Sequence, residues 1–381
     1  MRQYKFTLVY GFAIFAMFFG SGNLVFPIQI GYNSGSNWLW GFLGIFITGI
    51  LLPFLGLFVI KIHKGNYHSF FNEAGKLAGM IIPLFALSLL GPFAVVPRCI
   101  IVAYGSIAYI FPEVSLFSFS IIFCIIMFML CLKDQIMINI IGKWMCPVLM
   151  IVLSALILIG INKAQIPISS SNSAFIDAFL TGYQLMDLFA AFFFSSLIFT
   201  QIQSKFSKST THRDILLIAI KPSILGALLL GVIYFGFVYL GAHYNAILTN
   251  IAPEFMLPAI ANHLMGKNAA FLIGVATLLS CMTTAIALTN IYSRYICNCL
   301  NLKENKFWII LIITISATFA VSLLNFKGIA KFLAPILDIL YPGMIALTIL
   351  SIFFREQKKI KFYAFYGISA VMLIMNLVSY L

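Results

Sequence analysis

The chain has 381 residues, of which 62% are hydrophobic and only 9% are charged. This composition excludes a soluble globular domain, because such domains are about 45–50% apolar and about 25% charged. The formal net charge of +13 does not indicate nucleic-acid binding, since the basic residues stand singly or in small groups between apolar runs. The sequence therefore predicts an all-α, polytopic membrane protein.

Eleven apolar runs are long enough to cross a bilayer as helices, because the hydrocarbon core needs roughly 20 apolar residues per span. They cover residues 6–30, 37–60, 79–107, 115–132, 139–162, 178–200, 215–241, 268–293, 306–325, 329–354 and 361–380. At about 22 residues each, the spans use ~240 residues. Only short loops remain, so we expect no soluble catalytic domain between them.

The first span contains the segment Gly20-Ser21-Gly22-Asn23, which interrupts an apolar helix that Pro27 closes. Each glycine costs roughly 1 kcal/mol in a helix relative to alanine. A helix broken inside a membrane exposes amide groups that bind an anionic group such as a carboxylate, and carbonyl groups that coordinate a cation. Close packing of small residues between helices would explain the same pattern.

Three ionisable residues lie deep in predicted spans: Arg98 in the third, Asp187 in the sixth and Asp338 in the tenth. Each lies ~12–14 Å below the outer surface, at 1.5 Å per helical residue. Ionisable side chains are costly inside a membrane and mark functional sites. We expect them to form a gate or a coupling site that attracts cations, with a structural ion pair as the alternative.

The longest outer connection runs from about Gly241 to Lys267. It contains an amphipathic stretch from Pro253 to His263, which predicts either a short helix over the outer mouth or an ordinary loop.

The sixth span resembles the first when the chain is shifted by 173 residues, which aligns Tyr10 with Tyr183 and Leu24-Val25-Phe26 with Leu197-Ile198-Phe199. The two spans run in opposite directions, so five spans per unit indicate an inverted repeat. Within one membrane domain, the predicted units are 1–162 for spans one to five, 178–354 for spans six to ten, and 361–381 for the terminal span.

The distribution of positive charge predicts the orientation. With the N-terminus in the cytoplasm, the cytoplasmic segments carry 17 Lys and Arg residues and the outer segments carry 4. Because cytoplasmic loops are enriched in these residues, we expect the N-terminus inside and Leu381, after eleven spans, outside.

Several segments resemble the branched-chain amino acid system II carriers, which are leucine/isoleucine/valine:cation symporters of the leucine-transporter (LeuT) type. The matching segments, in family order, are FFGSGNLVFP at 18–27, GPFAVVPR at 91–98, IGKWMCPVL at 141–149, GYQLMDLFAA at 182–191 and CMTTAIALT at 281–289. The chain departs from the family in having eleven predicted spans where twelve are usual. Phe193 and Phe194 are also bulkier than the resemblance leads us to expect beside the pocket.

The resemblance implies a five-plus-five inverted repeat of transmembrane helices plus one extra helix, with a sodium ion between the first and eighth spans. The carbonyl groups of Ala16 and Phe19 would face the hydroxyl groups of Thr283 and Thr284. Hydrogen bonding within the eighth helix is the alternative role for the two threonines.

The resemblance also places the substrate at the first and sixth spans. The implied substrate-binding residues are Gly20, Ser21, Gly22, Asn23, Ala190 and Ala191. The amides of Ser21 and Gly22 would bind the substrate carboxylate, and Asn23 would orient the site or contribute to a second cation position. Ala190 and Ala191 would leave space for a branched aliphatic side chain.

The function implied is Na⁺-coupled symport of leucine, isoleucine and valine into the cell by alternating access, with no cofactor besides the coupling ion. The expected setting is the cytoplasmic (inner) membrane of a bacterium, where the protein acts as a monomer on a small-molecule substrate. A proton-coupled carrier of another small amino acid is the alternative, because Asp187 or Asp338 could titrate. An enzyme is disfavoured because the five histidines all lie in loops, and a channel because one broken helix suits a carrier better.

Overall fold

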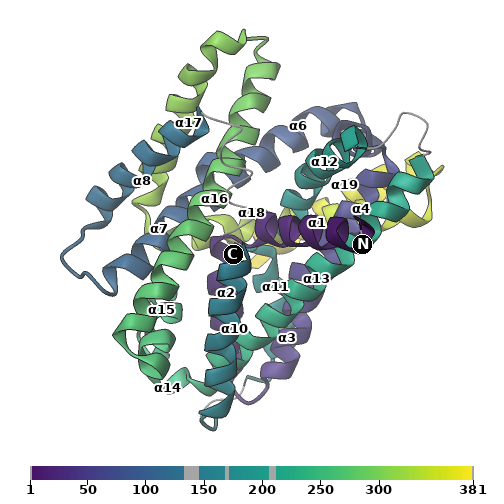
Figure 1. Cartoon of the computed structure of the whole chain (residues 1–381). Helices are drawn as coiled ribbons and strands as arrows, with labels where there is room; N and C mark the ends of the chain where they lie inside the picture. Colours follow the sequence, from purple (N-terminus) through teal and green to yellow (C-terminus); the bar gives the residue numbers. More distant parts are fainter. Residues whose placement is uncertain (1, 133–145, 168–170, 206–211, 380–381) are drawn as a thin grey trace.

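The computed structural model describes residues 2–132, 146–167, 171–205 and 212–379, which form helices joined by short connections (Figure 1). Six helices in the described part of the chain are long and apolar enough to cross a membrane, and two bent helix pairs pass the same test together, which gives up to eight spans. Three shorter apolar helices lie at the remaining predicted runs. Their positions agree with the eleven predicted runs. The predicted start of the fifth span and the end of the eleventh, with Leu381, lie outside the described residues.

The first five spans begin with a broken helix and contain two π-helical segments, η1 and η3. Their elements are α1 (Arg2–Phe18) and α2 (Ser21–Ser34); α3 (Trp38–Phe46), η1 (Ile47–Leu51) and α4 (Leu52–Ile62); α6 (Lys76–Ser88), η3 (Leu89–Phe93) and α7 (Val95–Ala108); α8 (Leu116–Cys131); and α10 (Cys146–Asn162). Two short helices, α5 (Tyr67–Phe71) and η2 (Asn72–Ala74), connect the second span to the third.

The remaining spans also begin with a broken helix. Their elements are α11 (Ala174–Tyr183) and α12 (Asp187–Lys205); α13 (His212–His243); α16 (Lys267–Cys299); α17 (Phe307–Ser322); α18 (Asn325–Phe353); and α19 (Lys358–Ser379). Short connecting helices are α14 (Asn245–Leu248), α15 (Pro253–Met265) and η5 (Glu304–Lys306). The amphipathic outer stretch is therefore a helix, α15, and the eighth span continues beyond its predicted end at residue 293 to Cys299.

The packing of the spans follows a two-fold pattern. Both halves of the first span pack along α13, the seventh span, while α11 and α12 of the sixth span pack along α3 and α4 of the second. The third and eighth spans meet through α7 and α16. Exchanging each span with the one five places away turns the contact between spans one and seven into that between spans six and two. The same exchange maps the contact between spans three and eight onto itself, as an inverted repeat requires. The boundaries 1–162 and 178–354 stay a prediction.

Glycines allow the first and seventh spans to touch backbone to backbone. A Cβ atom on Gly31 of α2 would lie 1.9 Å from the carbonyl oxygen of Val238, and one on Gly241 of α13 would lie 2.0 Å from that of Ile28. No larger side chain fits at such distances, so these glycines set how closely α2 lies against α13. The contact brings the broken region of the first span beside the middle of α13.

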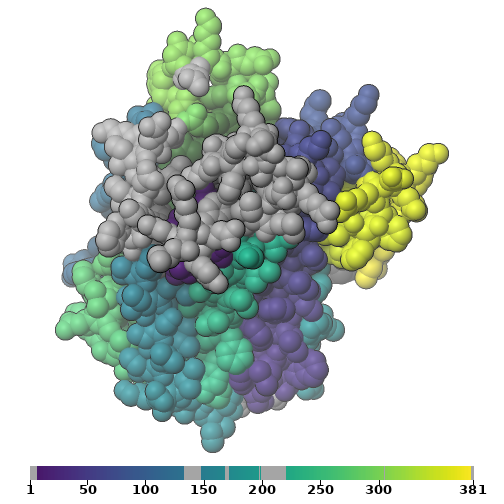
Figure 2. All heavy atoms as spheres, turned by 45° about the vertical axis from the view of Figure 1, so that its right-hand side comes forward, coloured from purple at the N-terminus to yellow at the C-terminus, as the bar shows by residue number. Residues whose placement is uncertain are grey.

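The last helix, α19, lies at the edge of the molecule, where it is yellow in Figure 2. Only 11% of its apolar stretch is buried, against 61% for the second span. It packs on α18 and reaches η2, where the buried Lys361 ammonium pairs with the Glu73 carboxylate. The terminal span therefore covers the bundle from one side and lies away from both helix breaks.

Candidate functional site

The first span bends by 72° between α1 and α2. The amide of Gly20 donates to the carbonyl of Phe18 at 2.8 Å and to Oδ1 of Asn23 at 3.1 Å. In a continuous helix this amide would bond to the carbonyl of Ala16, which here loses that partner. The break thus leaves amides at the start of α2 and a carbonyl near the end of α1 available to ligands.

The sixth span bends by 42° between Tyr183 and Asp187, a break that the sequence reasoning did not identify. Met186 has a φ of +60°, which residues other than glycine rarely adopt, so the chain turns sharply just before α12. The available signals were Gly182 before the break and an acidic residue opening the next helix. Both are too common to mark a break by themselves.

Asp187 joins the two breaks. It opens α12, is 4% exposed, and its Oδ2 accepts a hydrogen bond from Nδ2 of Asn23 at 2.7 Å and from the Tyr234 hydroxyl at 3.2 Å. The same Asn23 amide also contacts the Tyr234 hydroxyl. No cationic side chain in the described part of the chain forms an ion pair with Asp187. Its bonded partners are therefore neutral donors, one of them, Tyr234 on α13, not foreseen from the sequence.

Arg98 bonds to the other end of the sixth-span break. Its Nη1 donates to the carbonyl of Gln184 at 2.6 Å and its Nη2 to the Gln184 side-chain oxygen at 2.7 Å. The guanidinium lies 5.3 Å from the ring centre of Phe26 and 5.5 Å from that of Phe326, which are cation–π distances. Arg98 thus connects the first, third, sixth and tenth spans.

The three ionisable residues do not form one ion cluster. Arg98 is paired with an amide and a carbonyl, and no described carboxylate forms an ion pair with it. Asp338 is half-buried on α18 and has no hydrogen bond or ion pair within the described ranges. The geometry therefore gives no structural ion pair between these residues, and their role in gating or coupling stays a prediction.

Hydroxyl groups of α16 face the break in the first span. Ser280 donates to the carbonyl of Phe19 at 2.8 Å, and Thr283 donates to the carbonyl of Ser280 in its own helix at 2.7 Å. The Thr284 hydroxyl is buried without a hydrogen-bond partner among the described residues, and it lies 3.3 Å from where a Cβ atom on Gly20 would stand. A buried hydroxyl normally has a partner, so Thr284 points to a polar ligand at this position.

The donor set fits a hard cation. Oxygen ligands are what sodium-like ions require, and the candidates here are the carbonyls of Ala16 and Phe19 with the hydroxyls of Thr284 and Ser280. Thr283 follows the alternative role of bonding within its helix. Ser280 was missed, although it lies four residues before Thr284 and hence on the same helical face.

A small cavity lies between the two breaks. The volume that the centre of a water molecule can occupy in it is about 20 Å³, roughly what one bound water needs. It is lined by Met17, Phe18, Gly20, Ser21, Gly22, Asn23, Leu90, Val95, Arg98, Leu185, Asp187, Ala190, Phe194, Thr284 and Leu288. An amino acid of leucine's size does not fit, so the cavity has to widen for binding.

Most of the expected substrate residues line this cavity. The exception is Ala191, which packs against α4, where a Cβ atom on Gly56 would lie 3.2 Å from it. Phe193 also turns away and contacts the ring of Tyr67, with 5.0 Å between ring centres, whereas Phe194 lines the cavity. The difference follows from helical geometry, because consecutive residues point about 100° apart around a helix.

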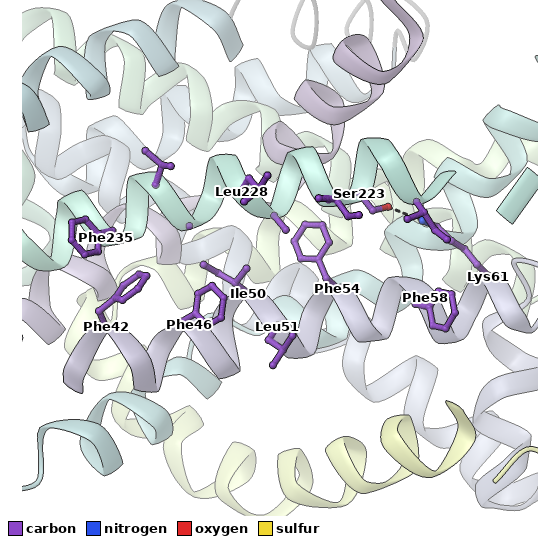
Figure 3. Close-up of a pocket in the computed structure, with 15 residues that line it drawn as sticks. Phe42, Phe46, Ile50, Leu51, Phe54, Phe58, Lys61, Ser223, Leu228 and Phe235 are labelled. Carbon is purple, nitrogen blue, oxygen red and sulfur yellow. Dashed lines mark hydrogen bonds between the residues drawn. The ribbon is translucent and has the colours of Figure 1, made fainter. Parts of the chain in front are cut away.

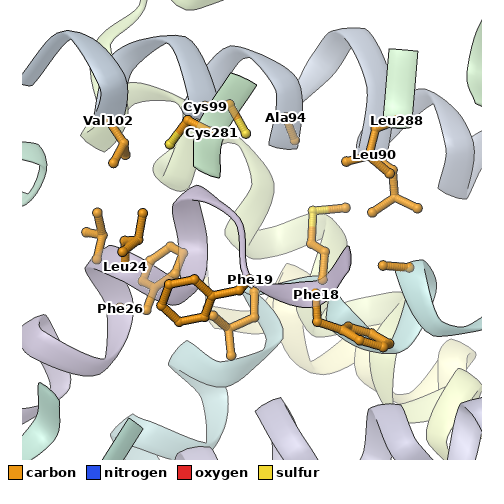
Figure 4. Packing of buried hydrophobic residues seen from close by; sticks show 14 of the residues in the cluster. Phe18, Phe19, Leu24, Phe26, Leu90, Ala94, Cys99, Val102, Cys281 and Leu288 are labelled. Atoms are coloured by element: carbon orange, nitrogen blue, oxygen red, sulfur yellow. The ribbon is translucent and has the colours of Figure 1, made fainter. Parts of the chain in front are cut away.

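Aromatic rings close the cavity on the α1 and α12 side. Phe18 meets Phe194 edge to face at 5.6 Å and Phe54 at 5.7 Å between ring centres. Figure 4 shows Phe18 and Phe19 at the break, with Cys99 and Cys281 facing each other above it. The Cys99 thiol lies 3.5 Å from the Ser21 hydroxyl, so the third span supports the start of α2 directly.

The sequence matches a family model described as branched-chain amino acid transport protein over residues 3–381. A putative branched-chain amino acid carrier protein of Staphylococcus epidermidis is 30% identical over 375 residues, which cover 92% of this chain and 83% of the relative. The branched-chain amino acid permease BraB of Bacillus subtilis is 28% identical over 374 residues, which cover 93% and 82%.

Solved transporter structures share the architecture. MhsT in complex with L-phenylalanine has a TM-score of 0.63 at 15% identity and covers 98% of both chains. Mhp1 in an inward-facing conformation has a TM-score of 0.62 at 13% identity and covers 92% of this chain and 77% of its own. At these identities the similarity concerns the fold, and it confirms the expected all-α, LeuT-type arrangement.

Proposed function

Because the chain belongs to the family of branched-chain amino acid transport proteins, we propose that it carries leucine, isoleucine and valine into the cell by Na⁺-coupled symport. Its relatives are named as carriers and permeases, so it is a multi-pass membrane transporter and not an enzyme. The observation that supports sodium coupling is the buried Thr284 hydroxyl beside the broken end of α1, which has no hydrogen-bond partner among the described residues.

The proposed cation site lies at the α1 end of this break. The C-terminal carbonyls of α1 carry the negative end of the helix dipole, so Ala16 and Phe19 attract a cation. Thr284 and Ser280 supply hydroxyl oxygens from α16. A sodium ion here would connect the first span to the eighth and give the Thr284 hydroxyl oxygen a partner.

The proposed amino acid lies at the N-terminal end of α2. The amides of Ser21 and Gly22, in the first turn of α2, meet its carboxylate with the positive end of the helix dipole. The Asp187 carboxylate lines the same cavity and provides a counter-charge for the ammonium group. The aliphatic side chain faces the apolar part of the lining, formed by Met17, Leu90, Val95, Leu185 and Leu288.

Selectivity among the three substrates is expected to be loose, since one methylene in an apolar pocket is worth only ~1–3 kcal/mol.

Alternating access requires the two barriers of the cavity to open in turn. The ring cluster of Phe18, Phe54 and Phe194 closes one side, and Arg98 with Phe26 and Phe326 closes the other. Each barrier includes a residue of the first span: Phe18 ends α1 just before the break, and Phe26 lies in α2 after it. A change in the bend at residues 19–20 therefore acts on both barriers.

The test is uptake of labelled leucine into proteoliposomes with and without an inward sodium gradient, at fixed pH and membrane potential. We expect sodium-dependent uptake that isoleucine and valine compete for. Thr284→Ala should raise the sodium concentration for half-maximal uptake by ~10-fold or more, the effect of losing ~1.4 kcal/mol of ion binding, while Thr284→Ser keeps the hydroxyl and the coupling.

Thr283→Ala is the matched control, because that hydroxyl bonds within its own helix. Equal sodium dependence in the two alanine variants, or no uptake of any aliphatic amino acid, would contradict the proposal.

Proton coupling is a second candidate, and the surroundings of Asp187 favour it. In the described structure the hydrogen bonds to Asp187 come from neutral donors. A charged carboxylate in such surroundings is costly inside a membrane, so Asp187 takes up a proton or a cation at some point of the cycle. Uptake driven by a proton gradient without sodium would select this mechanism.

We place the protein, as a monomer, in the cytoplasmic membrane of a bacterium with its N-terminus inside.

A further inference from the structure

A groove far larger than the binding cavity runs between the second and seventh spans. Its volume is about 550 Å³. Figure 3 shows Phe42, Phe46, Ile50 and Phe54 on one wall and Leu228 on the other. The mechanism proposed above does not use this groove.

The groove opens toward the bilayer. Leu51, Leu228 and Val232 line it and are 46%, 62% and 61% exposed, on helices that span the membrane. From Phe42 to Lys61 it extends ~28 Å at 1.5 Å per residue, close to the ~30 Å thickness of the hydrocarbon core. A long, apolar occupant parallel to the membrane normal fits this shape, as a lipid acyl chain does.

Among the described residues that line the groove, charge is present at one end. Lys61 is the ionisable side chain among them, and its ammonium donates to the Ser223 hydroxyl at 2.7 Å. Lys61 lies in the last turn of α4 and is only 2% exposed, whereas Lys221, two residues before Ser223, is exposed. The charge count predicts that this end is cytoplasmic, where lysines at the membrane surface attract anionic lipid headgroups.

We propose that this groove binds one anionic phospholipid of the leaflet at the Lys61 end. Its acyl chain lies between α4 and α13, and its phosphate lies at the level of Lys61 and Lys221. The site is independent of the transported substrate.

The lipid would contact the two helices that hold the broken spans. Both halves of the first span pack along α13, and α12 packs along α4. A bound lipid should therefore stabilise the arrangement around both breaks.

Gly231 allows the groove to be filled without disturbing the core. A Cβ atom there would meet only Ile50 Cδ1, at 3.8 Å, so Gly231→Leu places a side chain in the groove. Gly367 on α19 is the matched control, because a Cβ atom there meets nothing within 4 Å and the residue lies outside the groove. Ala227→Leu, one turn earlier on α13, is a second filling variant should Gly231→Leu fail to fold.

The experiment counts lipids retained by the purified full-length protein by native mass spectrometry, after addition of phosphatidylglycerol or of phosphatidylcholine with the same chains. We expect the parent protein and Gly367→Leu to retain one phosphatidylglycerol in preference to phosphatidylcholine, and Gly231→Leu to lose it. Lys61→Gln should lose the preference for the anionic headgroup. Undiminished phosphatidylglycerol binding in both filling variants, or equal retention of the two lipids by the parent protein, would overturn the proposal.

Discussion

Asp187 joins the two helix breaks by a hydrogen bond from Asn23. Its carboxylate accepts hydrogen bonds from Asn23 and Tyr234, so it determines how α12 starts relative to α2. Asn23 in turn uses its side-chain oxygen to bond the Gly20 amide. A series of hydrogen bonds thus runs from the first-span break through Asn23 to the sixth-span break. Substitution of any residue in this series disturbs both breaks.

Asp187→Asn should reduce leucine uptake by ~10-fold or more, because a hydrogen bond to a charged group is worth ~1.5–3 kcal/mol and the neutral amide removes that charge. Asp338→Asn is the control: that carboxylate is half-buried and unbonded in the described structure, so we expect less than a ~3-fold change. Initial rates of uptake in proteoliposomes measure both. Similar losses in the two variants would refute a special role for Asp187.

At the scale of whole elements, α2 and α13 pack so closely that their contact can be tested by adding a single methyl group. Gly31→Ala or Gly241→Ala would force a methyl group against a backbone carbonyl and push the helices apart, costing ~1–3 kcal/mol. Thermal unfolding in detergent should show a lower midpoint for either variant. Gly367→Ala has room for its methyl group and should leave the midpoint unchanged or raise it slightly.

Helix α15 carries a half-buried acid, Glu254. Burial raises the pKa of Glu254, and its own backbone hydrogen bond and the positive charge of Lys327 offset only part of the rise. An acid with a raised pKa favours the docked helix below its ordinary pKa of ~4.3, and this stabilisation is lost as pH rises toward the raised value. One carboxylate oxygen is buried without a partner in the described structure, consistent with a cost for the charged form.

Undocking of α15 should therefore increase with pH from about 4.3 upward. Hydrogen exchange of the amides at 253–265, corrected for the intrinsic rate at each pH, measures this opening. Glu254→Gln stays neutral and should give exchange that no longer depends on pH. Retained pH dependence in Glu254→Gln would assign the effect to another group.

For the molecule as a whole, the predicted orientation can be checked with a native thiol. Of the six cysteines whose side chains the structure describes, Cys299 at the end of α16 is exposed, and the other five are buried: Cys99, Cys124, Cys131, Cys281 and Cys297. If the N-terminus is inside, the end of the eighth span is cytoplasmic. A membrane-impermeant maleimide should then label inside-out vesicles much faster than right-side-out vesicles, and Cys299→Ser should remove the difference. Preferential labelling of right-side-out vesicles would reverse the orientation.

The sequence by itself determined the class of fold, the positions of the spans and the break in the first one. Lipid leaves the backbone no hydrogen-bonding partner except itself, so long apolar runs have to be helices. The break at Gly20 is equally local, because two glycines and an asparagine side chain that bonds back to the Gly20 amide lie within four residues. These features depend on neighbours in the chain, which a sequence displays directly.

Only the tertiary structure decided which groups meet. Arg98 bonds to Gln184, which is 86 residues away, and Asn23 to Asp187, which is 164 residues away. Ser280 instead of Thr283 reaches the Phe19 carbonyl, and Ala190 instead of Ala191 lines the cavity. Each choice depends on how a helix is rotated about its axis and against which partner it packs. Hydropathy does not specify that rotation in a helix that is apolar on every face.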